Sequence, residues 1–113
     1  MATLIRYRQL IQGHLSDLEI LVCQQPRAGV EKSCVFDEIH DRYLLVNTGW
    51  EQGHRVDGIT LDVRIRDDKT WVEEDWSEGD VAEYLVHAGV PRRDIVLGFQ
   101  PPSIRCYTEF AVA

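Results

Sequence analysis

Lysine is nearly absent from this sequence, and basic residues are outnumbered by acidic ones. Only Lys32 and Lys69 occur, and nineteen acidic side chains against twelve basic ones give a net charge of −7. A protein that binds DNA by itself must neutralise phosphate groups with lysine and arginine, and this electrostatic contribution supplies most of the non-specific affinity. The charge balance therefore predicts that the isolated chain does not bind DNA directly.

Cysteine is also scarce, and long apolar runs are missing. The three cysteines, Cys23, Cys34 and Cys106, are odd in number and widely spaced, which argues against a disulfide framework and suits a reducing compartment. No apolar run approaches the roughly 20 residues that cross a bilayer, and the first residues lack the order of a signal peptide. We expect a cytoplasmic protein that makes no membrane contact.

Motifs that carry chemistry are absent as well. The sequence has no Cys-x-x-Cys or His-x-x-x-His pair, and its serines lie in no strand-turn-helix elbow. Asp57 followed by Asp67-Asp68-Lys69 is similar to the carboxylates and lysine of a metal-dependent nuclease, but the second group lies in an expected hairpin turn, where ligands are poorly held. We expect no catalytic residues, no metal and no cofactor, and a nuclease acting alone stays an alternative.

The residues that are present indicate one globular domain. A chain of 113 residues with 44% hydrophobic and 27% charged residues is typical of a single domain, here residues 1–113. Residues 3–25 are expected to form an amphipathic helix that packs on a sheet. Its apolar stripe is broad enough that the helix could also contact a second subunit or a partner helix. Its apolar side consists of Leu4, Ile11, Leu15, Leu18 and Val22, widened by Leu10, Ile20 and Leu21.

Between residues 33 and 76 the apolar period changes to two. Ile59, Leu61, Val63 and Ile65 alternate with polar residues, which is typical of a strand with one buried face. Further strands are expected over residues 34–39, 43–51 and 70–76, which are rich in β-branched and aromatic residues. The short polar breaks between them favour hairpins, so the sequence predicts a four-stranded antiparallel meander.

A second helix is expected to begin near Ser77, whose hydroxyl would cap the first turn while Asp80 completes a capping box. Gly89 and Pro91 are expected to end this helix. Its buried side consists of Val81, Tyr84, Leu85 and Ala88. The predicted fold class is α+β: an N-terminal helix, the meander, the second helix and a docked C-terminal segment.

The C-terminal segment, residues 94–113, is apolar, aromatic and stiffened by two prolines, whereas the end of a chain is usually polar. Burying each large apolar side chain is worth about 1.5–3 kcal/mol, so the segment is expected to dock on the domain as a final strand or to form an interface. The candidate interface residues in it are Phe99, Pro101, Pro102, Arg105, Tyr107 and Phe110.

An acidic stretch supplies a second candidate surface. Six acidic residues lie between positions 73 and 83. These residues would be explained if they lay at a solvated strand end and in the first turn of a helix. The alternative is that they bind a basic partner electrostatically, and salt would then weaken the association. Trp71 and Trp76 alternate to opposite faces, so one is expected in the core and the other at the surface. The candidate interface residues here are Glu73, Glu74, Asp75 and Trp76.

Several of these segments together carry a family resemblance. The tail runs Asp-Ile-Val-Leu-Gly-Phe over residues 94–99, then Pro101-Pro102, then Tyr-Thr-Glu-Phe-Ala-Val-Ala over residues 107–113. With residues 41–46, Gly49-Trp50, 82–86 and 88–91, it resembles the XisI-like family of cyanobacterial fdxN-element excision controlling factors. The resemblance spans nearly the whole chain, and the tail is its most specific part.

The resemblance implies a XisI-like fold without catalytic residues. It also implies an accessory role in site-specific excision of a DNA element, beside a separate recombinase and a companion factor called XisH, and protein–protein contacts would carry such a role. An antitoxin-like inhibitor that masks a basic nuclease partner is an alternative. A homodimer through the first helix or through a sheet edge is a further expectation.

Overall fold

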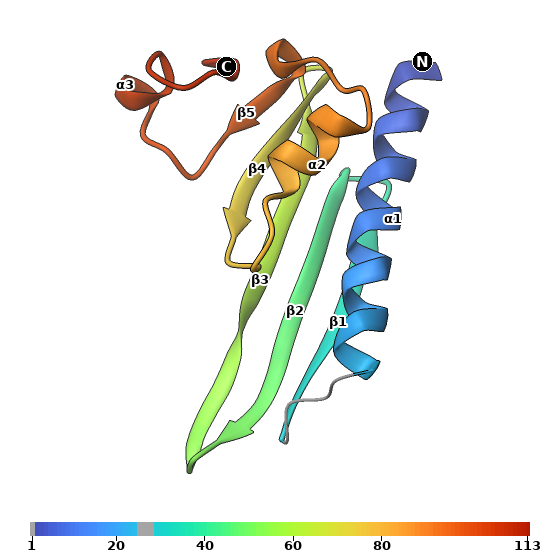
Figure 1. The fold of residues 1–113 in the computed structure, drawn as a ribbon, viewed down its shortest axis with the longest axis vertical. Helices are drawn as coiled ribbons and strands as arrows, with labels where there is room; N and C mark the ends of the chain where they lie inside the picture. Colours follow the sequence, from blue (N-terminus) through green and yellow to red (C-terminus); the bar gives the residue numbers. More distant parts are fainter. Residues whose placement is uncertain (1, 25–28) are drawn as a thin grey trace.

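The computed structural model describes residues 2–24 and 29–113 (Figure 1). The predicted helix end at Gln25 lies outside these residues, and the side chains of Val22 and Cys23 lie outside the described side chains. The elements, in chain order, are α1 (Ala2–Gln24), β1 (Val30–Asp37), β2 (Arg42–Glu51), β3 (His54–Arg66), β4 (Lys69–Asp75), α2 (Val81–His87), the 3-10 turn η1 (Arg92–Asp94), β5 (Ile95–Leu97) and α3 (Pro102–Arg105).

The sheet has five strands in the order β1-β2-β3-β4-β5. The first four pair as consecutive antiparallel hairpins, as the sequence predicts. The prediction of only four strands is wrong, because β5 pairs with β4 in parallel through Thr70–Ile95, Trp71–Val96 and Val72–Leu97. The α2 segment supplies the crossover that a parallel pair requires. With three residues, β5 is too short to show alternation in the sequence.

Two tight turns join the central strands. Gln52 and Gly53 have φ values of 51° and 79°, and Asp67 and Asp68 have φ values of 54° and 63°. Two consecutive residues with positive φ form the turn type that matches the twist of a two-residue hairpin. The β3–β4 turn therefore holds Asp67 and Asp68 at an exposed end of the sheet.

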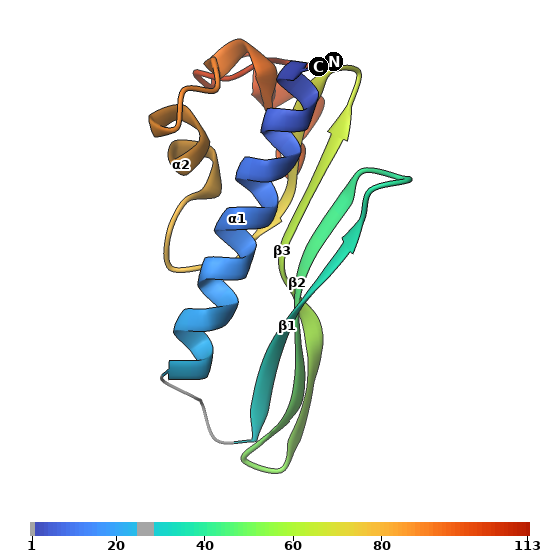
Figure 2. The same cartoon turned by 90° about the vertical axis from the view of Figure 1, so that its right-hand side faces the viewer.

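The helices α1 and α2 both cover the same face of the sheet (Figure 2). From α1, Tyr7, Ile11 and Leu15 are fully buried, and the sheet contributes residues such as Tyr43 and Leu61. Leu4, Leu10 and Leu18 pack partly against this core, which confirms most of the predicted apolar side. Ile20 and Leu21 are more than half exposed, so the stripe is narrower than the sequence suggests.

Tyr7 belongs to the core although the predicted apolar side of the helix did not include it. Its ring is 2% exposed, and its hydroxyl donates to Asp94 Oδ2 at 2.6 Å. Burial, together with the neighbouring carboxylate, raises the pKa of Tyr7 to about 12. This bond ties α1 to the turn before β5, so the first helix and the last strand are held together.

The N-terminus of α2 is capped by Asp80 and not by Ser77, which corrects the predicted capping box. Asp80 has extended backbone angles, and its carboxylate accepts from the N–H groups of Ala82 and Glu83. The Ser77 hydroxyl instead donates to the Asp75 carboxylate. Both residues are good caps, and the helix begins three residues later than predicted because Asp75 holds the preceding turn.

No helix in the part of the chain that the structure describes combines the length and apolar character that spanning a bilayer requires.

Candidate partner interface

The C-terminal segment docks on the outer side of β5. Ala111 forms a parallel bridge with Val96, and its N–H donates to Ile95 O at 2.8 Å. Phe110 is half-buried and packs against the core. The segment therefore closes the β5 edge of the sheet, as a final strand would, although it forms a single bridge there.

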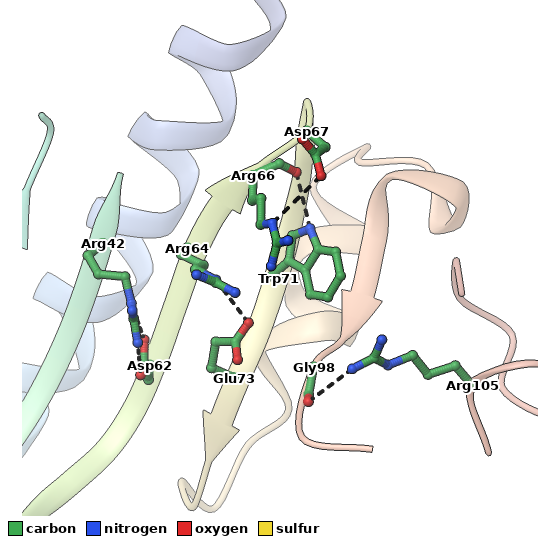
Figure 3. Close-up of polar contacts among 9 residues, drawn as sticks. All are labelled: Arg42, Asp62, Arg64, Arg66, Asp67, Trp71, Glu73, Gly98 and Arg105. Atoms are coloured by element: carbon green, nitrogen blue, oxygen red, sulfur yellow. Dashed lines mark hydrogen bonds and ion pairs between the residues drawn. The ribbon is translucent and has the colours of Figure 1, made fainter. Parts of the chain in front are cut away.

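Arg105 is the organising residue of this segment. Its Nε donates to Gln100 O at 3.1 Å, while Nη1 and Nη2 donate to Val112 O and Gly98 O at 3.4 Å. Its guanidinium also lies 5.3 Å from the centre of the Trp71 ring (Figure 3). Three backbone carbonyls and one aromatic ring hold Arg105 in place. This predicted interface residue therefore stabilises the C-terminal segment through contacts within the chain.

Other predicted residues of the segment face solvent. Tyr107 is 83% exposed and Phe99 is 49% exposed, while Pro101 and Pro102 are also exposed. Phe110 turns inward under the Arg92 guanidinium, which lies 5.2 Å from its ring centre. Phe110 and Arg105 therefore dock the segment, while Phe99 and Tyr107 remain exposed.

Most of the acidic stretch has structural partners. Glu73 pairs with Arg64 at 3.1 Å, and Glu83 pairs with Arg92 at 3.2 Å. Asp75 accepts from the N–H groups of Ser77 and Val81, both at 3.0 Å. The interpretation as a strand end and a helix start therefore explains much of this stretch.

The two tryptophans separate as expected. Trp71 is 7% exposed and Trp76 is 76% exposed. The indole N–H of Trp76 donates to a carboxylate oxygen of Glu74, so the exposed ring and the acidic stretch form one surface. A large exposed aromatic ring beside carboxylates suits a protein interface, where tryptophan is enriched at binding hot spots.

A pocket joins the two predicted surfaces. It has a volume of about 200 Å³ and is lined by Val72, Asp75, Gly79, Asp80, Ala82, Leu97, Phe99 and Phe110. Two carboxylates contribute negative charge, and aliphatic and aromatic side chains form the other walls. Within the described part of the chain, none of the residues that line the pocket is basic. Such a pocket suits a long side chain with an apolar stem and a cationic head, such as lysine or arginine.

The nuclease-like residues do not come together. Asp57 lies near the start of β3, and Asp67 to Lys69 lie beyond its other end. Among the residues that the structure describes, no group of three His, Cys, Asp or Glu side chains could hold a metal ion. Burial, with a hydrogen bond to Glu19, raises the pKa of the Cys34 thiol to about 12, so it is not a reactive thiolate at neutral pH.

The helix-free face of the sheet carries an arrangement that the sequence analysis missed. Arg42 forms a bidentate pair with the buried Asp62, at 3.1 and 2.7 Å (Figure 3). Arg64 and Arg66 lie 5.9 and 5.2 Å from the centre of the Trp71 ring. The alternation of Asp62, Arg64 and Arg66 along β3 is the signal that could have placed these charges on one face.

Known proteins similar to this chain cover almost its full length. A family model described as XisI protein matches residues 1–112. A solved XisI-like protein from Anabaena variabilis ATCC 29413 is 33% identical, with 97% of this chain and 99% of that chain covered and a TM-score of 0.88. The solved fdxN element excision controlling factor XisI from the same organism is 36% identical, with 98% and 99% covered and a TM-score of 0.85. No curated protein matches the chain.

Proposed function

This chain belongs to the XisI family, and we therefore propose that it is a non-catalytic accessory factor that controls the site-specific excision of a DNA element. The observation that carries this proposal is the similarity to a protein named as an fdxN element excision controlling factor, 36% identical over 98% of this chain. Such a role places the protein in the cytoplasm, beside the DNA that is rearranged.

We propose that contact with other proteins, and not chemistry, is the means of control. The partners would be a companion factor of the XisH type and a recombinase that cuts and joins the DNA. The net charge of −7 disfavours direct binding to DNA. It favours association with a basic protein surface, because opposite charges speed encounter and set orientation.

The pocket between α2 and the C-terminal segment is the proposed contact site. Asp75 and Asp80 accept hydrogen bonds from backbone N–H groups at the start of α2. A lysine or arginine of the partner would place its charge beside them and its stem against Phe99 and Phe110. Trp76 would extend this contact on one side, and Pro101, Pro102 and Tyr107 would extend it on the other. Glu74, the cross-strand partner of Asp62, faces the helix-free side of the sheet. Glu73 and Arg105 hold the surface in shape.

The same acidic surface favours one alternative, an antitoxin-like inhibitor that covers the basic surface of a nuclease. The two functions share the contact and differ in the partner. A nuclease acting alone has no support from the site geometry, since its candidate residues lie at opposite ends of β3.

An excision reporter tests the proposed function. A plasmid would carry the element borders and be supplied with the recombinase and the companion factor, with or without this chain. We expect the excised junction, measured by quantitative PCR, to depend on this chain and to fall with Phe99→Ser. Ile39→Ser is the matched control, because Ile39 is 90% exposed in the β1–β2 turn. Excision that proceeds equally without the chain would refute the role.

A further inference from the structure

The end of the chain, residues 100–113, follows β5 as an irregular segment that we call the strap (Figure 1). The structure describes every residue of the strap, and none of their side chains is fully buried. The short helix α3 inside the strap also buries no residue. The strap is therefore attached to the domain by a small number of contacts, which is typical of a segment that opens locally while the rest of the domain stays folded.

Two contacts attach the strap to the sheet. The Arg105 guanidinium lies over the Trp71 ring of β4, with 5.3 Å between its Cζ atom and the ring centre. The Ala111 N–H donates to Ile95 O of β5 at 2.8 Å. Neither contact buries a large apolar side chain of the strap, so neither has the hydrophobic contribution that makes core contacts strong.

Arg92, in η1, joins the strap to α2. Its Nη1 atom lies 3.2 Å from Glu83 Oε1 of α2 and 3.0 Å from Glu109 Oε2 of the strap. Its guanidinium also lies 5.2 Å from the centre of the Phe110 ring. A planar guanidinium with several donors can bind carboxylates and stack on a ring at the same time. One side chain therefore links α2, η1 and the strap.

The strap also forms part of the pocket that is the proposed contact site, and in this respect the inference rests on the proposed function. Phe110 lines the pocket together with Asp75 and Asp80. Phe99 is held independently of the strap, because its N–H donates to Val72 O of β4 at 3.3 Å. When the strap opens, the pocket keeps its two carboxylates and Phe99, but it loses the wall that Phe110 supplies.

We propose that the strap opens and closes as a unit while the sheet remains folded, and that Arg92 is the clasp that favours the closed state. A partner that contacts Phe110 in the pocket binds the closed state, so partner binding and strap closure favour each other. The apparent affinity for the partner then falls as the closed fraction falls. Because the Arg92 clasp lies at the surface, salt screens its ion pairs and favours the open state.

Hydrogen exchange on the isolated chain tests the proposal. The Ala111 amide should exchange faster than the amides of the central strand β3, with a weak dependence on urea, because opening the strap exposes little surface. Arg92→Ala should speed exchange at Ala111 by roughly 10-fold, since it removes two surface ion pairs and one cation–π contact. Arg93→Ala, which removes an exposed charge from the same turn, is the matched control and should leave the rate unchanged.

Salt provides a second readout, which a purely apolar attachment would not show. Raising NaCl from about 0.05 to about 0.5 M should speed exchange at Ala111 in the wild-type chain and in Arg93→Ala. The same change should have a smaller effect in Arg92→Ala, because the screened ion pairs are already absent.

The proposal is overturned if Ala111 and β3 exchange at the same rate and with the same urea dependence, because the strap then opens only with the whole domain. It is also overturned if Arg92→Ala and Arg93→Ala behave alike. Both measurements use the chain alone, so their outcome does not depend on a partner. A strap that opens as proposed, in a chain that never binds the companion factor, would support the clasp and contradict the proposed function.

Discussion

At the scale of single residues, His14 links stability to pH. Its ring on α1 stacks on Tyr84 of α2, with centroids 4.2 Å apart and planes 17° from parallel. Burial at this contact lowers the pKa of His14 from its ordinary value of 6.5, and the charges of Asp75 and Asp17 oppose this shift. His14 is therefore held in its neutral form where the two helices meet.

We expect the free energy of unfolding to rise as the pH increases toward about 6.5, and the His14 contribution then to level off. The unfolded chain, whose histidine has the higher pKa, binds the proton more readily, so acid favours unfolding. His14→Phe should remove this part of the slope, and His87→Phe, at an exposed position of α2, should retain it. Urea midpoints from about pH 5 to 7.5 measure the slope, and an unchanged slope in His14→Phe would contradict the account.

At the scale of elements, the antiparallel strands and the two longer helices followed from the sequence, and β5 did not. The alternation of Ile59, Leu61, Val63 and Ile65 was visible because β3 is long. In contrast, Ile95 and Val96 are both fully buried, so β5 shows no alternation at all. Its residues pair with β4 residues that lie 25 positions earlier, as in Thr70 with Ile95, and such a separation is beyond the reach of a local pattern.

The start of α2 shows a different limit. Ser77 and Asp80 are both suited to cap a helix, and the choice between them depends on backbone angles. Asp80 has φ −135° and ψ 106°, which are the extended angles of a cap residue. The carboxylate of Asp75 fixes the turn before it, and this contact is not visible in the sequence.

The C-terminal segment depends on Arg105 for its position. We expect Arg105→Ala to loosen the segment without unfolding the sheet, because three backbone carbonyls lose their donor while the core remains packed. Hydrogen exchange at the Ala111 amide, which bonds to Ile95 O, should become faster. Arg93→Ala, at an exposed position of η1, is the control. Slow exchange at Ala111 in Arg105→Ala would show that Phe110 alone holds the segment.

At the scale of the whole molecule, the proposed partner pocket lies on the helix-covered side of the sheet. The pocket includes Val72 and Ala82, which belong to the helix-covered side.

The candidate residues were visible in the sequence, and their assembly into one pocket was not. Phe99 and Phe110 stood out as apolar residues near a chain end, and Asp75 stood out in an acidic stretch. The crossover through α2 and the parallel pairing of β5 bring them together. The same topology turns Arg105 inward, which residue type alone could not indicate.

Co-elution with the companion factor tests the central claim most directly. The chain would be expressed with the neighbouring companion gene product and separated by size exclusion at low and high salt. We predict stable co-elution that weakens at high salt and with Phe99→Ser, and that persists with the exposed control Ile39→Ser. Separate elution of the two folded proteins at every salt concentration would contradict control through protein contact.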